Sequence, residues 1–222
     1  MDRPIVRAHQ VHGADLLIRR AGDPLRAALA DADIIVSNDP TVAIAIQVAD
    51  CVPILIADRR TGAVAAAHAG WRGLAAGVPR VTVEALAHEF GSRPADLIAA
   101  AGPSIGACCY EVGPDVRRRF EEARWPESTT SRWFFTRPQP TMGNPSMAGL
   151  RTEPRPGHWY FDSGRATSDQ LESAGVPRDQ IFVAELCTAS HPRALCSYRR
   201  DGAAAGRIAG AITASSIRPH RP

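Results

Sequence analysis

Two short apolar runs joined by a polar turn constrain this fold more than any other stretch of the 222-residue sequence. Residues 52–57 are mostly apolar, residues 58–62 read Asp-Arg-Arg-Thr-Gly, and residues 63–67 are apolar again. Runs of this length separated by a glycine-containing turn are typical of an antiparallel hairpin. The sequence therefore predicts a buried β-hairpin around which the rest of the chain is organised.

Cys51 and His68 bracket this hairpin. With a turn centred near Arg59 and Arg60, they lie almost opposite one another on neighbouring strands and face the same side, with Cβ atoms about 5 Å apart. A thiolate and an imidazole so placed can share a metal ion or act as a nucleophile and its base. A buried free cysteine beside a hydrogen-bonded histidine is the alternative.

The composition favours one large core. With 45% apolar residues, we expect a single domain over residues 1–222. The five cysteines show no C-x-x-C spacing, which argues against a disulfide framework and a zinc ribbon. The sequence shows neither an apolar stretch of membrane-spanning length nor a secretory signal, so we expect a cytoplasmic protein without a membrane partner.

All 26 basic residues are arginines. The absence of lysine excludes Schiff-base chemistry, pyridoxal phosphate attachment and a phosphate-loop lysine. Anions must then be held by guanidinium groups or backbone amides. The net charge is only +3 and the arginines are dispersed, so no nucleic-acid partner is expected.

Alternation and turn signals divide the remaining sequence into short elements. Besides the hairpin, we expect strands over residues 5–11, 15–20, 33–36, 42–48, 97–101, 158–162, 181–185 and 207–212. We expect helical segments over residues 24–30, 81–90, 113–124 and 165–175, and a frayed tail over residues 215–222. Residues 126–156 are expected to form an irregular insertion held to the body by Trp133, Phe134 and Phe135.

Residues 102–106 (Gly-Pro-Ser-Ile-Gly) match the nucleophile elbow of serine hydrolases, with Asp162 and His191 following in the required order. That elbow needs a helix directly after the serine, whereas the next helix signal begins near Pro114. Pro103 also restricts the sharp turn. The serine hydrolase interpretation is therefore disfavoured.

Two further pairs have ordinary explanations. Cys108 and Cys109 could form a redox pair, but neighbouring cysteines bridge poorly, so we expect them to pack in the core or in a pocket wall. Asp31 and Asp33 could form a carboxylate pair, but a solvated turn explains them equally well.

Two arginine-containing segments could bind an anion. Arg72 lies between glycines soon after His68, where a small backbone lets an anion approach its guanidinium group. Residues 197–201 (Ser-Tyr-Arg-Arg-Asp) offer a second clamp through Arg199 and Arg200. Surface salt bridges are the alternative for both segments.

The ordered series of motifs resembles one family. It comprises residues 10–13 (Gln-Val-His-Gly), 49–51 (Ala-Asp-Cys), 68–73 (His-Ala-Gly-Trp-Arg-Gly), 102–106, 109–112 (Cys-Tyr-Glu-Val) and 197–201. Together these resemble the laccase-domain family, also called the multicopper polyphenol oxidase-like or purine nucleoside phosphorylase family, which includes the peptidoglycan editing factor. The resemblance implies an α+β fold with mixed β-sheets flanked by helices, similar to cytotoxic necrotizing factor-like cysteine hydrolases.

The resemblance also implies a site. In that family, the residues matching His12, Cys51 and His68 bind one zinc ion, with copper as the alternative metal. Two imidazoles and one thiolate leave a fourth position open, as in catalytic sites. The implied reactions are phosphorolysis of adenosine, inosine, guanosine or methylthioadenosine, and adenosine deamination, in a monomer or homodimer.

We assign roles to residues near these ligands. Asp50, next to Cys51, is the candidate proton shuttle. Arg72, with Arg199 or Arg200, is expected to hold phosphate against C1′ of the ribose, and Ser104 is expected to contact substrate.

Three alternatives stay open. Cys51 and His68 could serve a cysteine- or metal-dependent hydrolase of peptidoglycan precursors. Polyphenol oxidation is disfavoured because seven histidines and three methionines form no cluster in the sequence. A non-enzymatic metal-binding protein is the third. Family members carry some tens of residues before the first motif, whereas eleven precede His12; we expect either a misassigned start or an incomplete pocket wall.

Overall fold

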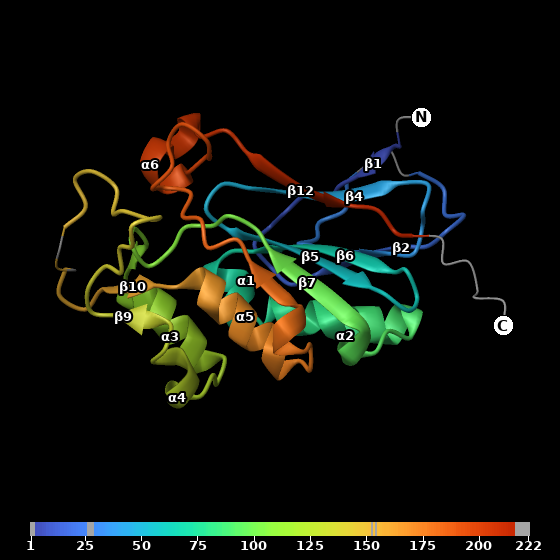
Figure 1. Cartoon of the computed structure of the whole chain (residues 1–222), viewed down its shortest axis with the longest axis horizontal. Coiled ribbons are helices and arrows are strands. Elements are labelled where there is room, and N and C mark those ends of the chain that lie inside the picture. The colour runs from blue at the N-terminus through green and yellow to red at the C-terminus, as the bar shows by residue number, and fades with distance from the viewer. Residues whose placement is uncertain (1–2, 26–28, 152, 154, 216–222) are drawn as a thin grey trace.

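The computed structural model describes residues 3–25, 29–151, 153 and 155–215. Its central layer is a six-stranded sheet with the order β11-β7-β5-β6-β3-β2 (Figure 1). The middle pairs are antiparallel, whereas β2 with β3 and β11 with β7 are parallel. The strands are β2 (Leu16–Arg19), β3 (Ile34–Ser37), β5 (Val52–Asp58), β6 (Val64–Ala69), β7 (Leu97–Ala101) and β11 (Ile181–Val183).

Helices cover one face of this sheet (Figure 1). They are α1 (Trp71–Ala75), α2 (Val78–Phe90) and α5 (Ser163–Ser173). Alternate residues of the strands point toward them, so Ile34 and Ile54 pack in one cluster with Leu86 and Leu171. The core between the sheet and these helices is filled mainly by isoleucine, valine and alanine side chains of the buried strands.

A second, three-stranded sheet covers the opposite face (Figure 1). Its order is β1-β4-β12, and its strands are β1 (Ile5–Val6), β4 (Ala43–Val48) and β12 (Ile208–Ile212). Ile35 and Ala66 of the central sheet pack here against Ile44 and Ile46. Along β5 and β6, side chains that face this second sheet alternate with side chains that face the helices. Cys51 packs on the face toward the second sheet.

The predicted insertion, residues 126–156, contains one short helix and contributes the edge strand β9 to a third sheet with the order β8-β10-β9. Trp133 is fully buried, and its Nε1 donates to Oδ2 of Asp169 at 2.7 Å. Phe134 stacks on Phe161 with ring centroids 4.8 Å apart. The prediction that aromatic side chains fix the insertion is confirmed. The elements here are β8 (Glu111–Val112), α3 (Pro114–Glu122), α4 (Glu127–Thr130), β9 (Phe134–Phe135) and β10 (Trp159–Phe161).

The remaining elements are one short helix and three 3-10 turns. They are α6 (Tyr198–Asp201), η1 (Pro94–Asp96), η2 (Arg178–Gln180) and η3 (Gly202–Ala204). No helix in the described ranges is long and apolar enough to cross a membrane.

Most predicted elements are confirmed, with bounds that differ by a few residues, and the mixed α+β fold class is confirmed as well. One expectation is wrong: the first strand ends at Val6 rather than residue 11. Helix α1 was not predicted, and α2 starts at Val78, three residues before the expected start, with Pro79 in its first turn. The expected turns over residues 24–30 fall partly, and the tail over 215–222 mostly, outside the described residues.

The hairpin is confirmed with a shifted register. His68 pairs with Pro53 rather than with Cys51. The turn is centred between Arg60 and Thr61, because the Asp58 carboxylate accepts from both of their N–H groups and Gly62 adopts a φ of 75°. Cys51 and His68 nevertheless face the same side of the sheet, as predicted. Cys51 lies one residue before the start of β5, and His68 lies one residue before the end of β6.

Candidate metal centre

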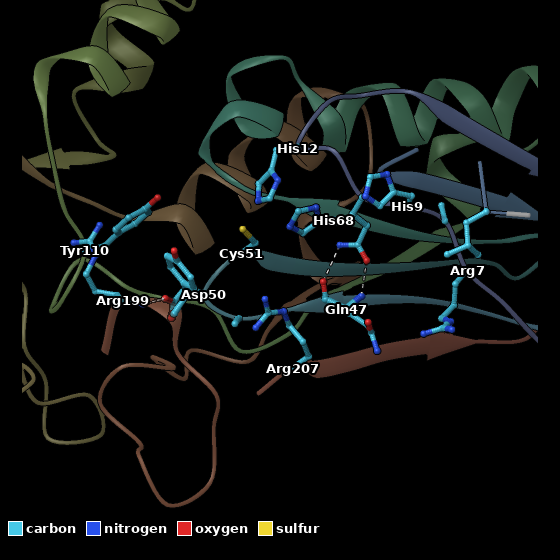
Figure 2. A pocket seen from close by; sticks show the side chains of 15 residues that line it. Arg7, His9, His12, Gln47, Asp50, Cys51, His68, Tyr110, Arg199 and Arg207 are labelled. Atoms are coloured by element: carbon cyan, nitrogen blue, oxygen red, sulfur yellow. Dashed lines mark hydrogen bonds between the residues drawn. The ribbon is translucent and has the colours of Figure 1, made fainter. Parts of the chain in front are cut away.

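The structure brings together three side chains that are far apart in the sequence. His12 lies in the loop between β1 and β2, Cys51 directly precedes β5, and His68 is the penultimate residue of β6. One ligand atom from each, two ring nitrogens and one Sγ, lie within 4.8 Å of one another. Figure 2 shows the three side chains converging at one end of the hairpin.

Asp33 fixes the orientation of His68. Asp33 directly precedes β3 and follows the register of its pairing with β6, and His68 Nδ1 lies 2.7 Å from Oδ1 of Asp33. A carboxylate only accepts hydrogen bonds, so Nδ1 carries the proton and Nε2 keeps its lone pair for a metal. The pair is almost fully buried, which favours a single ring orientation.

The same carboxylate also shapes the loop that carries His12. The backbone N–H groups of Val11, His12 and Gly13 all donate to Asp33, at 3.2, 3.1 and 2.6 Å. His12 has a φ of 62°, an uncommon conformation that these bonds stabilise. Burial acts to raise the pKa of Asp33, but the hydrogen bonds from His68 and the loop hold it below its usual value. One ionised carboxylate therefore positions two of the three ligands.

The expectation of a solvated turn is wrong for Asp33, which is fully buried. Asp31 is exposed, as expected, but it forms an isolated β-bridge with His9 rather than a turn, and its carboxylate lies 2.8 Å from His9 Nδ1. The two carboxylates differ in burial because Asp33 directly precedes β3 and faces the end of β6, whereas Asp31 lies two residues earlier in the chain, outside the sheet core.

Burial controls the protonation of the other two ligands. It lowers the pKa of His12, with a further contribution from His68 and from the positive charge of Arg72, so the imidazole is neutral near pH 7. Burial, Asp50 and Asp33 raise the pKa of the Cys51 thiol to about 12. A neutral imidazole is ready to coordinate a metal, whereas the thiol loses its proton when a cation binds.

The donor set fits a zinc ion. Two imidazoles and one thiolate match the ligand types and the three-ligand count of open zinc sites. Gly70 is also matched to the site, because a Cβ atom there would meet Cys51 Sγ at 2.9 Å and His12 Cδ2 at 3.1 Å. His68 is buried, Cys51 half-buried and His12 exposed, so the cluster opens on one side.

The cluster opens into a cavity of about 510 Å³, which we call the metal-centre cavity. This volume is within the range of small-molecule sites. Besides the three ligands and Asp50, its walls include Gln47, Tyr110, Tyr198 and the arginines Arg7, Arg199 and Arg207 (Figure 2). The cavity thus combines aromatic surface with positive charge.

Asp50 reaches across the chain to the C-terminal segment. Its Oδ1 accepts from Thr188 Oγ1 at 2.5 Å, and its Oδ2 accepts from the Arg199 backbone N–H at 2.6 Å. Asp50 has a φ of 83°, which those contacts hold in place. Its carboxylate therefore lies in the cavity wall and points toward Arg199 (Figure 2).

Two arginines in the wall are positioned for an anion. Arg199 lies over the Tyr110 ring, with Cζ 5.0 Å from the ring centroid, and donates one hydrogen bond to the Glu111 carbonyl. Arg207 donates from the same nitrogen, Nη1, to the carbonyls of Ala205 and Gly206. Each of the two arginines therefore keeps further guanidinium N–H groups that these hydrogen bonds do not use.

Three predicted site residues lie elsewhere. Arg200 donates to the carbonyls of Thr188 and Leu195 and fixes that loop. Arg72 is exposed and stacks on Trp71, 4.2 Å from the ring centroid. Ser104 is buried, with its Oγ 3.4 Å from that of Ser163. None of the three is among the residues that line the metal-centre cavity.

The disfavoured serine hydrolase triad is not assembled in the described part of the chain. Asp162 caps helix α5 by accepting from the Arg165 N–H, and His191 hydrogen-bonds to Asn144 instead. Ser104 is followed by turns rather than by a helix.

Residues of this site that sequence reasoning did not assign include Asp33, Gln47, Tyr110, Tyr198 and Arg207. Tyr110 carried a signal, because it belongs to the Cys-Tyr-Glu-Val motif. Asp33 carried a weaker one, an acidic residue directly before a buried strand. Gln47 and Arg207 carried none, since they lie in strand β4 and just before β12 and reach the cavity only through the pairing of those strands.

Relatives of known name share much of this sequence. Escherichia coli purine nucleoside phosphorylase YfiH is 36% identical over 203 residues, which are 91% of this chain and 71% of that protein. A purine nucleoside phosphorylase of Bacteroides thetaiotaomicron is 34% identical over 180 residues, 81% of this chain and 60% of that protein. The chain therefore spans about 60–71% of the length of these two relatives.

Crystal structures share the fold. The Bacillus licheniformis protein YfiH superposes with a TM-score of 0.80 at 29% identity, covering 95% of this chain and 74% of that one. YlmD from Geobacillus stearothermophilus gives 0.74 at 30% identity, covering 96% and 74%. The sequence profile described as "Multi-copper polyphenol oxidoreductase laccase" matches residues 1–215. With the motifs, the fold and these matches in agreement, the chain belongs to the laccase-domain (YfiH) family.

Proposed function

We propose that this protein is a zinc-dependent purine nucleoside phosphorylase. It would convert adenosine, inosine, guanosine or methylthioadenosine and phosphate into the free base and the pentose 1-phosphate. The observation that carries the proposal is the convergence of His12, Cys51 and His68 at the mouth of an arginine-lined cavity. The names of the relatives from E. coli and B. thetaiotaomicron support the same reaction.

The cavity suits both substrates. Its volume of about 510 Å³ can enclose a nucleoside with a phosphate group. Tyr110 and Tyr198 offer aromatic surface for a purine ring, and the exposed Gln47 amide can donate to and accept from its edge. Arg199 and Arg207 offer paired N–H groups for phosphate. We therefore assign phosphate binding to Arg199 and Arg207 rather than to Arg200.

The reaction exchanges one bond for another at C1′ of the sugar. The bond from C1′ to the purine nitrogen breaks, a bond from C1′ to a phosphate oxygen forms, and the leaving purine takes up one proton. Arg199 and Arg207 hold the phosphate close to C1′, where positive charge develops as the first bond breaks. Asp50 is the proposed proton carrier, since its carboxyl group lies in the same wall.

His12, Cys51 and His68 would hold the zinc ion, and Asp33 would keep His12 and His68 in position. An ion held there would supply Lewis-acid polarisation of a substrate atom. Arg72, outside the cavity wall, acts in this proposal through its charge, which helps to keep His12 neutral.

Adenosine deamination is the second proposed activity of the same site, because it needs the same purine-binding walls and a metal next to them. A cysteine hydrolase without metal is a weaker candidate. Its nucleophile needs a thiol with a lowered pKa, whereas burial and two carboxylates raise the pKa of Cys51.

The test is incubation of the zinc-loaded protein with adenosine, with and without phosphate. We expect adenine and ribose 1-phosphate only when phosphate is present, and inosine in either case if the site also deaminates. Removal of zinc by a chelator should abolish both, and added zinc should restore them.

Two results would contradict the proposal. Free ribose and adenine in the absence of phosphate would indicate a nucleoside hydrolase. Cleavage of peptidoglycan precursors that survives chelation, with no turnover of nucleosides, would identify the cysteine hydrolase instead.

A further inference from the structure

A second cluster of metal-ligating side chains lies outside the metal-centre cavity. Cys108 and Cys109 come from the turn after β7, and Cys187 comes from the segment after β11. Their three Sγ atoms lie within 4.8 Å of one another. All three residues are buried, with 2%, 0% and 2% of their surface exposed. Two segments that are about 79 residues apart in the sequence thus bring three sulfur atoms together in one buried cluster.

Backbone amides point at two of the sulfur atoms. The Gly106 N–H donates to Cys187 Sγ at 3.4 Å, and the Met147 N–H donates to Cys109 Sγ at 3.2 Å. Amide hydrogen bonds to sulfur stabilise the thiolate over the thiol.

The insertion covers this cluster. Ser146 Oγ donates to the Cys108 carbonyl at 2.8 Å, and the Cys187 N–H donates to Asn144 Oδ1 at 2.7 Å. Ser190 Oγ donates to the Pro145 carbonyl at 2.6 Å and lies 3.5 Å from both Cys108 Sγ and Cys109 Sγ. The residues around the sulfurs are therefore held by a network of polar contacts, as metal ligands are in known sites.

An ion can reach the cluster. Cys108, Cys187 and Gly106 line a second cavity of about 540 Å³, which is also lined by α5 and is separate from the metal-centre cavity. The sulfur atoms are also at a suitable spacing. Metal–sulfur bonds of about 2.3 Å place sulfurs about 3.8–4.0 Å apart around one ion, so small side-chain rotations suffice from the observed limit of 4.8 Å.

We propose that Cys108, Cys109 and Cys187 form a second metal site, which binds one monovalent copper ion through three sulfur atoms. Thiolates select soft ions such as Cu(I) and Zn(II). A structural zinc ion takes four protein ligands, whereas the cluster offers three and the Ser190 hydroxyl is a poor fourth. Binding releases the thiol protons to solvent, and the Gly106 and Met147 amides offset part of the remaining negative charge.

An ion at this site would stabilise the part of the metal-centre cavity wall that Asp50 forms. Thr188, next to Cys187, holds the Asp50 carboxylate, and Ser104 forms a β-bridge with Cys187. An ion between residues 108–109 and 187 ties the two segments that carry these contacts. The site is closed and structural, whereas the site at His12, Cys51 and His68 is open.

The test is anaerobic titration of the reduced, zinc-loaded protein with Cu(I) against a coloured copper chelator. We expect one bound equivalent of Cu(I) and thiolate-to-copper absorption in the ultraviolet. X-ray absorption at the copper edge should show sulfur neighbours only, whereas the zinc edge should show nitrogen and sulfur. This measurement uses the wild-type chain, so it does not depend on the folding of a variant.

Two variants complete the test. Cys187→Ser should lose the copper equivalent while keeping zinc, and Cys196→Ser, which changes a free cysteine outside the cluster, should keep both. The proposal is overturned if copper shows nitrogen neighbours, if Cys187→Ser keeps its copper, if the three sulfurs take up zinc in preference, or if the reduced protein binds no copper at all.

Discussion

His68 Nδ1 lies 2.7 Å from Oδ1 of Asp33, and the other bonds to this carboxylate come from the loop that carries His12. One buried residue that binds no metal thus orients two ligands. Replacement of Asp33 by asparagine removes the acceptor charge and lets the His68 ring turn. We expect zinc affinity to fall by about 10- to 100-fold, measured by competition with a zinc indicator.

Asp31→Asn is the matched control, because that residue lies two positions away and is exposed. Its zinc affinity should equal that of the wild type. If Asp33→Asn also binds zinc normally, Asp33 has no role in ligand orientation.

His68→Ala removes one of the three proposed zinc ligands. We expect complete loss of bound zinc and of both phosphorolysis and deamination, because the remaining imidazole and thiolate do not hold the ion at catalytic concentrations. Elemental analysis and product chromatography measure these losses. His88→Ala, at an exposed position on α2, should retain both. An active, metal-free His68→Ala protein would refute the assignment of the site.

Gly70→Ala tests how closely the ligands pack. A Cβ atom at this position would lie 2.9 Å from Cys51 Sγ and 3.1 Å from His12 Cδ2, so both ligands must shift. The backbone φ of −74° suits alanine, so strain of the main chain is not the cause. We expect weaker zinc binding with little change in the melting temperature. Gly143→Ala, with no atom within 4 Å of its added Cβ, should bind zinc normally.

Arg207→Ala tests the assigned phosphate site. Loss of a charge-assisted hydrogen bond of about 1.5–3 kcal/mol corresponds to about a 10- to 100-fold rise in KM for phosphate. The KM for adenosine should change much less, because the proposed purine-binding residues, Tyr110, Tyr198 and Gln47, are unchanged. Arg118→Ala, an exposed arginine on α3, is the control. Equal effects on both KM values would argue against a specific role in binding phosphate.

The buried ion pair of Arg19 and Asp39 predicts a pH dependence of stability. Asp39 accepts from Arg19 at 2.6 and 3.0 Å, and their side chains are 9% and 1% exposed. Burial acts to raise the pKa of Asp39, but hydrogen bonds from Thr41 and Arg19 hold it below its usual value. A lowered folded-state pKa stabilises the fold above about pH 4, and this stabilisation is lost as the pH falls through the folded-state pKa.

Asp39→Asn leaves the buried guanidinium without its anion, and we expect about 3–5 kcal/mol of destabilisation at pH 7. Urea unfolding from pH 7 downward should show this difference shrinking in acid. Asp179→Asn, at an exposed position, should follow the wild-type curve throughout. A difference that stays constant with pH would contradict the role given to the ion pair.

The hairpin and the two ligands that bracket it were accessible to sequence reasoning because their signals are local. Alternation, turn residues and the antiparallel geometry place Cys51 and His68 on one side without further information. The exact register was not accessible, since it depends on how the Asp58 side chain bonds to Arg60 and Thr61.

Contacts between distant strands were the least predictable part. Gln47 and Arg207 reach the cavity because β4 pairs with β12, and no local pattern in either segment predicts that pairing. Asp33 meets His68 through the pairing of β3 with β6. Arg199 and Arg200 are neighbours with the same chemistry, yet only Arg199 lines the cavity, because the backbone of α6 turns Arg200 toward the loop at Thr188.

The order of the site residues along the chain has a consequence for biosynthesis. His12, Asp33, Cys51 and His68 all lie in the first 68 residues, whereas Tyr110, Thr188 and Arg199 follow much later. The strands that carry the early group, β2, β3, β5 and β6, pair with one another. During translation, the segment with the three candidate zinc ligands is therefore complete while Tyr110, Thr188 and Arg199 are still unsynthesised. Under the proposed function, the nascent chain would be able to bind zinc before it can bind a nucleoside.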